Sequence, residues 1–273
     1  MTFIQHQKNG LVWLTAPHME TPHAFTTRLG GVSRGIFASL NLAASRGDEE
    51  DKVRENYRLL EEATGIPTHH MAFTRQVHGA DVRVVSHADA HRLFTDMPYE
   101  ADGLVTAERG LALICFIADC VPVLLSDESH GVIAAVHCGW RSSVADILGN
   151  AVGKMCALGA RPECISAAIG PAISRCCFEV GGEVVAAVQA LLGEHCADLW
   201  AAEEGKPGKF LLDLKGVNAR RLEQLGLRRE KIVISPDCTM CQSDVYWSHR
   251  KSAGQRGSQA ALIVWDGKER AKA

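Results

Sequence analysis

The chain has 273 residues, of which 47% are hydrophobic and 22% are charged, and its formal net charge is −3. These values describe a globular protein with an apolar core, and they exclude an intrinsically disordered chain. A slightly acidic total attracts neither a phosphodiester backbone nor an anionic membrane over long range, so nucleic acid and membranes are not expected partners.

The spacing of apolar residues divides the chain into strands and helices. Short apolar runs rich in β-branched residues predict strands, and apolar residues three and four positions apart predict helices. A glycine follows each predicted helix, as is common at helix C-termini. In chain order the predicted elements are a strand at 11–14, a helix at 51–64, strands at 81–85, 111–117, 121–126 and 132–138, a helix at 143–158, a strand at 164–169, helices at 182–192 and 215–225, and strands at 231–235 and 259–265.

The strands between residues 111 and 138 follow one another with only turns between them. Successive parallel strands need a longer crossover, usually a helix, so this order argues against a doubly wound parallel sheet. We therefore predict an α+β layered fold. Because no repeat, low-complexity tract or Pro/Ser-rich linker divides the sequence, we expect one domain over residues 1–273.

The N-terminal residues and the most apolar stretch both argue against export and membrane insertion. Residues 1–14 lack the uninterrupted apolar block of a secretory signal. The stretch 111–125 contains Asp119 and Pro122 and is too short to cross a bilayer. We expect a cytoplasmic protein.

The ten cysteines are irregularly spaced and, without an export signal, are expected to be reduced. Cys176 and Cys177 are adjacent, and a disulfide between them would be strained, so they are interpreted as separately packed residues. Cys238 and Cys241 form a lone Cys-x-x-Cys pair, which is interpreted as structural or as part of a loop.

Three segments place a metal-competent side chain at the edge of an apolar run. Two imidazoles and a thiolate, from His78, Cys120 and His137, suit zinc, and three protein ligands leave a position open for water or substrate. The segments are Gln-Val-His-Gly at 76–79, Ala-Asp-Cys at 118–120 and Val-His-Cys-Gly-Trp-Arg at 136–141.

Spacing alone leaves two other interpretations open. In the first, His78 and His137 are hydrogen-bonded histidines at strand ends and Cys120 is a small buried apolar residue. In the second, Cys120 is a nucleophile and one of the two histidines is its base, as in cysteine hydrolases.

A glycine-rich loop with two arginines occupies residues 27–35. Its glycines would let backbone N–H groups approach an anion, but it has neither the Walker lysine spacing nor a Gly-x-Gly-x-x-Gly pattern. A turn between strands is the favoured interpretation. Asn41, which follows this loop, is by its context a turn or capping residue.

Further short motifs follow in a defined order. They are Phe-Ala-Ser-Leu-Asn-Leu at 37–42, Ala-Asp-Gly at 101–103, Val-Pro-Val-Leu-Leu at 121–125, Ile-Gly-Pro at 169–171, Phe-Glu-Val-Gly at 178–181, Asp213-Leu with Asn218, and Cys238-Thr239 leading into Tyr246 and Arg250. Together with the segments above, this set resembles the YfiH-like family. Its members are also called laccase-domain or multicopper polyphenol oxidase-like proteins and, in bacteria, peptidoglycan editing factor. The resemblance spans roughly residues 23–265, and several motifs in order are far more specific than one alone.

The resemblance implies a four-layer α/β/β/α sandwich with mixed sheets, of the YfiH-like type. It also implies that His78, Cys120 and His137 are zinc ligands, with copper as the alternative metal. By the same matching, Cys120 is catalytic, and Arg28 and Asn41 face the substrate.

The activity that the resemblance implies is a purine nucleoside phosphorylase acting on adenosine, inosine or methylthioadenosine, with adenosine deaminase activity as well. The expected partners are a purine nucleoside and phosphate, bound by a monomer or homodimer. In phosphorolysis, phosphate needs anion-holding groups. We expect zinc or Arg28 to orient it, Arg141 or Arg256 to assist, and Asn41 to contact the nucleoside.

Other functions remain open at this stage. The His-x-Glu and Pro-Cys-x-x-Cys signature of the zinc nucleobase deaminases is absent, so homology to that class is not supported. A multicopper laccase is less favoured because the chain has no His-x-His pair. An amidase or cysteine-type hydrolase that edits peptidoglycan precursors is a further alternative, and a non-enzymatic interaction protein is the least favoured.

Overall fold

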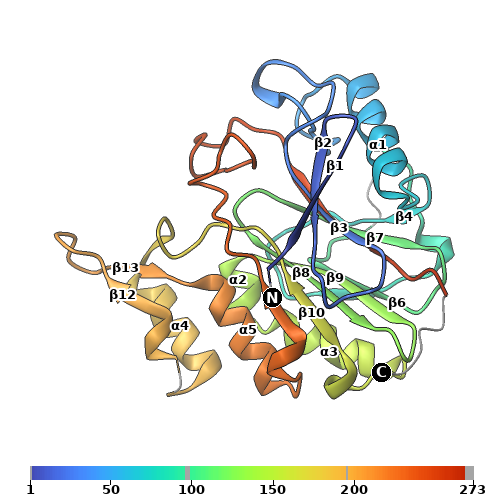
Figure 1. Cartoon of the computed structure of the whole chain (residues 1–273). Helices are drawn as coiled ribbons and strands as arrows, with labels where there is room; N and C mark the ends of the chain where they lie inside the picture. Colours follow the sequence, from blue (N-terminus) through green and yellow to red (C-terminus); the bar gives the residue numbers. More distant parts are fainter. Residues whose placement is uncertain (1, 96–98, 195, 268–273) are drawn as a thin grey trace.

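Two six-stranded sheets pack face to face, and helices cover their outer faces (Figure 1). The computed structural model describes residues 2–95, 99–194 and 196–267. Helix α1 (Glu50–Thr64) lies over the first sheet, and α2 (Trp140–Val144), α3 (Ile147–Ala157) and α5 (Leu214–Gln224) lie over the second. Helix α4 (Gly182–Leu192) packs beside them against α2, α5 and a small third sheet. The layers are therefore helix, sheet, sheet and helix, which confirms the predicted α+β fold with an α/β/β/α order.

The first sheet has the strand order β1-β2-β3-β15-β7-β4, and all its neighbours are antiparallel except β4 and β7. Within this sheet, β15 near the end of the chain pairs with β7 from its middle. The strands are β1 (Ile4–Lys8), β2 (Leu11–Thr15), β3 (His23–Thr26), β4 (Met71–Ala72), β7 (Ala112–Ile117) and β15 (Gln259–Val264).

The second sheet has the order β14-β10-β8-β9-β6-β5. Its edge pairs β10/β14 and β5/β6 are parallel, and the pairs between them are antiparallel. The strands are β5 (Val82–Val84), β6 (Gly103–Thr106), β8 (Val121–Asp127), β9 (Val132–Cys138), β10 (Ser166–Ile169) and β14 (Ile232–Ile234). A third, antiparallel sheet of order β11-β13-β12 consists of β11 (Glu179–Gly181), β12 (Trp200–Ala202) and β13 (Lys209–Leu212).

The helices end where the glycine signals indicate. Gly65 and Gly193 take up the C-cap positions of α1 and α4 with φ of 72° and 74°, a region that glycine enters without strain.

The central strands are buried on both faces, which explains their continuous apolar sequences. On β9, Ile133 and Ala135 pack between the two sheets, whereas Val132, Ala134 and Val136 pack against the helices. Alternate side chains of β9 therefore contribute to two hydrophobic cores, one on each face of the sheet.

The single helix predicted at 143–158 is wrong, because Asp146 divides it into α2 and α3. Asp146 adopts φ of 62°, and its carboxylate accepts the N–H of Gly149 at 3.1 Å as a helix N-cap. The same carboxylate binds Arg221 on α5 through two hydrogen bonds of 2.7 Å. The break is therefore marked by a local N-cap and by a contact with a neighbouring helix.

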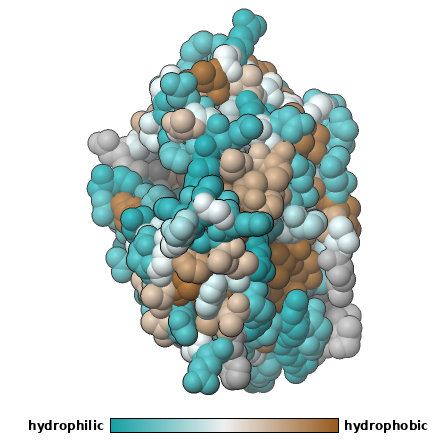
Figure 2. Space-filling view, turned by 90° about the vertical axis from the view of Figure 1, so that its left-hand side faces the viewer, coloured by the Kyte–Doolittle hydropathy of each residue, from teal (hydrophilic) through white to brown (hydrophobic). Residues whose placement is uncertain are grey.

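The surface has the mixed character of ordinary globular proteins. In the face shown in Figure 2, hydrophilic residues predominate and apolar residues form separate patches. Among the helices of the described residues, none has the length and apolar character needed to cross a membrane.

Candidate metal centre

Three side chains that are distant in the sequence meet beside the end of β9. The ligand atoms of His78, Cys120 and His137 all lie within 4.8 Å of one another. Cys120 Sγ is 3.8 Å from His78 Nε2, and the two imidazole rings are 4.9 Å apart between centroids. The structure therefore brings together the three predicted ligands.

His137 is held by a buried carboxylate. It lies on β9, and its Nδ1 is 2.8 Å from Asp102 Oδ1. Since an ionised carboxylate only accepts hydrogen bonds, Nδ1 carries the proton and Nε2 is left as the basic nitrogen. Such a carboxylate partner fixes the ring orientation of a metal-ligating histidine.

The same carboxylate positions the loop that carries His78. Asp102 accepts the backbone N–H groups of Val77, His78 and Gly79 at 3.0, 2.9 and 2.8 Å. His78 itself has φ of 62°, an uncommon value for a residue other than glycine. One buried acid thus sets the place of both imidazoles.

Gln76 fastens the start of this loop to the first sheet. Its side-chain amide donates to Phe116 O at 2.8 Å, and its side-chain carbonyl accepts the N–H of Phe116 at 2.7 Å. The side chain of Gln76 therefore makes the two hydrogen bonds to β7 that a neighbouring strand would make. It anchors the loop two residues before His78.

Cys120 lies in the tight turn between β7 and β8. The preceding residue, Asp119, has φ of 86°. Its carboxylate accepts a hydrogen bond of 2.6 Å from Thr239 Oγ1 and one of 2.7 Å from the backbone N–H of Arg250. These contacts hold the turn and aim Cys120 at the two histidines.

Gly139 leaves the room that the three side chains occupy. A Cβ at this position would lie 2.9 Å from His78 Cδ2 and 3.5 Å from Cys120 Sγ. Its φ of −69° is open to any residue, so the requirement for glycine is one of space.

The environment favours a thiolate at Cys120. Burial disfavours the charged form, but the positive charge of His137 and hydrogen bonds from both imidazoles lower the pKa of the Cys120 thiol to about 6. Burial also opposes a charge on His137, yet the Cys120 thiolate and the Asp102 carboxylate raise its pKa to about 9. The deprotonated sulfur is the form that binds metals and attacks electrophiles.

The donor set fits zinc and also fits copper. Thiolate and imidazole are borderline to soft donors, and three of them leave a coordination position free. The residues do not distinguish the two metals.

The three donors line a pocket of about 590 Å³, which is within the range of small-molecule sites. Four cationic side chains gather on its wall, namely those of Arg46, Arg75, Arg250 and Arg256. Aromatic rings, including those of Phe94 and Phe116, line another part. The pocket thus combines anion-holding groups with flat apolar surfaces.

Arg256 is the most buried of these cations. Burial and the nearby charge of Arg46 lower its pKa to about 10. Its Nη1 donates to Gly257 O and Ser258 Oγ, whereas its Nε has no hydrogen-bond partner among the described residues. A half-satisfied guanidinium in a pocket is suited to an anionic ligand.

Arg28 is placed behind the pocket and is not one of its lining residues. Its guanidinium donates to Ala38 O through Nε and Nη2, at 3.0 and 2.7 Å, and to Ser243 O through Nη1. It also stacks on Trp247, with Cζ 3.9 Å from the ring centroid. These contacts join two loops, and substrate contact by Arg28 stays a prediction.

Asn41 is fully buried. Its Oδ1 accepts the N–H groups of Ala43 and Ser258, both at 3.0 Å, and its Nδ2 donates to Asp48 Oδ2 at 2.9 Å. Because Ala43 and Ser258 line the pocket, Asn41 shapes the wall from behind, and its direct contact with a nucleoside stays a prediction.

The glycine-rich loop uses its N–H groups within the protein. Gly31 N–H donates to Ser39 Oγ, and Val32 N–H donates to Asn56 Oδ1 at 2.8 Å. A Cβ on Gly31 would lie 2.3 Å from Ser39 O. The glycines serve close packing of loop on loop, but the segment connects β3 to α1 and is not the predicted turn between two strands.

Sequence reasoning gave no role to Asp102, Gln76 or Asp119. The sequence does contain a signal for them. Gln76 and Asp102 lie in motifs shared with the family, and Asp119 directly precedes the predicted ligand Cys120. Arg141, named as a helper for phosphate, stacks on Trp140 at 4.4 Å and is not among the pocket residues.

Fold and site together define a mixed α+β protein with a two-histidine, one-cysteine candidate metal centre in a basic pocket. The family model described as multi-copper polyphenol oxidoreductase laccase matches residues 22–266, and the chain belongs to this family. The resemblance seen in the motifs is thereby confirmed.

Relatives and solved structures agree with this assignment. A purine nucleoside phosphorylase of Deinococcus radiodurans is 43% identical over 255 residues, which cover 93% of each chain. The crystal structure of YlmD from Geobacillus stearothermophilus has a TM-score of 0.88 at 33% identity, covering 96% of this chain and 99% of that one. That of the hypothetical protein YfiH from Bacillus licheniformis also has a TM-score of 0.88, at 28% identity, covering 95% and 98%. Relatives named purine nucleoside phosphorylase support an enzyme of this kind.

Proposed function

We propose that the protein is a zinc-dependent purine nucleoside phosphorylase that acts on adenosine, inosine or methylthioadenosine. The observation that carries the proposal is that one pocket contains both the thiolate and imidazole centre and a group of cationic side chains. Relatives of similar length that bear this enzyme's name add support.

Phosphorolysis requires an anion next to a developing cation. Phosphate attacks C1′ of the ribose as the bond to the base breaks, and positive charge builds on the sugar. Arg256 and Arg46 are suited to hold phosphate, since their mutual repulsion is relieved by an anion between them. Fixing both reactants in one orientation supplies much of the rate.

The centre itself needs each of its residues in a fixed state. Asp102 keeps the proton of His137 on Nδ1, and the low pKa of Cys120 keeps its sulfur deprotonated. Held by Cys120, His78 and His137, zinc would retain an open coordination position and act there as a Lewis acid.

Arg28 and Asn41 act in this proposal as positioning residues. Arg28 ties residue 38 to residue 243, and Asn41 ties Ala43 to Ser258. Asn41 therefore sets the shape of the wall that faces the nucleoside, and Arg28 fixes two loops that lie outside the lining of the pocket. Phe94 and Phe116 offer the flat apolar surface against which a purine base packs.

The test is an assay with metal-defined protein and inosine or adenosine, with and without phosphate. Release of ribose 1-phosphate that depends on phosphate supports the proposal. Ammonia from adenosine without cleavage of the sugar bond would assign a deaminase instead. Phenol oxidation by the copper-loaded protein, with no release of base, would assign the oxidase that the family description names.

One observation favours a second function, a cysteine-type hydrolase acting on peptidoglycan precursors. Cys120, His137 and Asp102 form a chain of thiolate, imidazole and carboxylate, which is also the arrangement of a cysteine nucleophile with its base. The two functions differ in how iodoacetamide reacts with Cys120. If a metal holds the sulfur, zinc should protect it from alkylation; equal alkylation of zinc-loaded and zinc-free protein would favour the hydrolase.

A further inference from the structure

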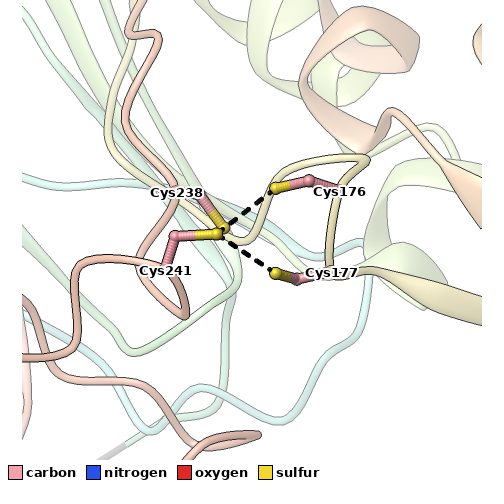
Figure 3. Close-up of side chains that lie close together, drawn as sticks. All are labelled: Cys176, Cys177, Cys238 and Cys241. Atoms are coloured by element: carbon pink, nitrogen blue, oxygen red, sulfur yellow. Dashed lines mark hydrogen bonds between the residues drawn. The ribbon is translucent and has the colours of Figure 1, made fainter.

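A second group of metal-competent side chains lies outside the site described above. The sulfur atoms of Cys176, Cys177, Cys238 and Cys241 all lie within 4.8 Å of one another (Figure 3). Cys241 Sγ is 3.5 Å from Cys176 Sγ and 3.3 Å from Cys177 Sγ. The side chains of the two loops point toward a common centre.

Sheet topology brings the two loops together. Cys176 and Cys177 follow β10, and Cys238 and Cys241 follow β14, which is the parallel neighbour of β10. A bridge between Ala172 and Cys238 continues this pairing beyond the strands. The loops therefore leave the sheet side by side, although Cys177 and Cys238 are 61 positions apart in the sequence.

The distances suit a tetrahedral ion. A zinc–sulfur bond of about 2.3 Å in tetrahedral geometry places the sulfurs roughly 3.8 Å apart. The observed separations, from 3.3 Å to no more than 4.8 Å, lie on both sides of this value. Small side-chain rotations would bring all four atoms to one ion.

An N–H donor and a buried cation lie around one of the four sulfurs, that of Cys238. The backbone N–H of Ser174 donates to Cys238 Sγ at 3.4 Å. The buried ammonium group of Lys215 donates to Ser235 O and to Asp237 O, the residue next to Cys238. A buried cation and an N–H donor both stabilise thiolates, which four-sulfur zinc sites require.

We propose that Cys176, Cys177, Cys238 and Cys241 bind a structural zinc ion, distinct from the centre at Cys120. Four protein ligands complete the tetrahedron and leave no position for substrate. The ion would join the loop after β10 to the loop after β14.

This cross-link would support the wall of the pocket. Ile173 and Phe178, which bracket the first cysteine pair, line the pocket. Thr239, between the second pair, donates to Asp119, the residue before Cys120. The four-cysteine site would thus hold the turn that presents Cys120 without taking part in the chemistry.

The experiment counts zinc in variants of the full-length protein. In a Cys120→Ala background, where the first centre is disabled, we expect about one zinc per chain after desalting. Adding Cys176→Ser and Cys241→Ser, both exposed positions, should reduce it to about zero. Adding Cys164→Ser, a partly exposed thiol outside both clusters, should leave it unchanged.

Cobalt gives a second readout that does not depend on the stability of the Cys176→Ser and Cys241→Ser variants. Cobalt-loaded protein with Cys120→Ala should show the intense sulfur-to-cobalt charge-transfer absorption of a tetrahedral four-thiolate site. A zinc-free Cys120→Ala protein without this spectrum would overturn the proposal. So would disulfides among the four cysteines in freshly purified protein, seen as a mass deficit by intact-mass measurement. Since neither readout uses a nucleoside, failure of the phosphorylase assay leaves this proposal unaffected.

Discussion

Two buried histidines on adjacent sheets differ only in their partners. His23, on β3, is 6% exposed; its Nδ1 donates to Thr21 O and its Nε2 accepts the N–H of Ala16, both at 2.7 Å. His137, on β9, is 3% exposed, but its Nδ1 faces a carboxylate and a thiol lies within reach. Burial lowers the pKa of His23 to about 4, whereas Cys120 and Asp102 raise that of His137 to about 9 despite burial.

The difference shows what separates a structural histidine from a reactive one. Backbone groups on both nitrogens fix a neutral ring and use up its hydrogen-bonding capacity. A carboxylate on one side leaves the other nitrogen basic and available. The partner, and not the depth of burial, determines the role.

The largest effect is expected from removing the sulfur of Cys120, which distinguishes the surroundings of His137 from those of His23. Cys120→Ala should lower kcat/KM for phosphorolysis at least about 1000-fold, because the centre loses a ligand and its negative charge. Steady-state kinetics with inosine and phosphate would measure this. The matched control is Cys164→Ser, which should keep full activity. Near-normal turnover by the Cys120 variant would show that the candidate metal centre takes no part in the reaction.

A smaller effect is expected from changing the carboxylate. Asp102→Asn should reduce metal affinity or kcat by about 10- to 100-fold, since an amide cannot accept all four N–H groups that Asp102 accepts.

Asp127 provides the control, because it is a buried carboxylate 2.8 Å from His130 Nδ1 and outside the pocket. Asp127→Asn should lower thermal stability but leave the kcat of folded protein unchanged. Equal losses of kcat in both variants would mean that Asp102 acts only through folding.

Filling the space beside Gly139 with a methyl group should have a moderate effect on metal binding. Gly139→Ala places a methyl group 2.9 Å from His78 Cδ2, and the displacement should weaken metal binding about 10-fold. Competition with a chelator of known affinity measures the change. Gly153→Ala, in α3 with nothing within 4 Å of its Cβ, should instead raise the free energy of unfolding by about 0.5–1 kcal/mol.

The smallest effect on activity is expected at His23, where stability alone should change. Its folded pKa of about 4 is below the unfolded value of 6.5, so between these pH values the unfolded chain binds more protons. The free energy of unfolding should therefore fall as the pH drops from 6.5 to 4, by on the order of 3 kcal/mol. Chemical denaturation at several pH values, compared with His23→Gln, should show a flatter slope in the variant. Parallel slopes would contradict a neutral His23.

The long strands β7, β8, β9 and β15 were predictable because burial on both faces leaves a continuous apolar run, whereas β1, β3 and β6 of the same sheets were not predicted. Residues 132–138 were predicted with the same limits that β9 has. Short edge strands such as β4 and β11 were missed, since two or three residues carry no periodicity. The break at Asp146 was missed because it depends in part on Arg221, a contact between helices.

The candidate centre was predictable in its ligands but not in its supports. His78, Cys120 and His137 were predicted because each is a metal-binding residue type at the end of a predicted strand. The family motifs then assigned all three to one site. That one carboxylate reaches both His137 and the loop of His78 depends on how β6 pairs with β9, which spacing does not encode. The two cysteine pairs were interpreted separately, because only the parallel pairing of β10 with β14 places them together.

The shared use of Asp102 has a consequence for how such a site can change over generations. Both imidazoles are anchored by the same acid, so a lineage that replaces it weakens the hold on two donors in one step. A substitution at Val77, whose backbone N–H makes the contact with Asp102, does not carry that penalty. The inheritance of this single side chain, more than that of either histidine, is what a comparison of diverging lineages should follow.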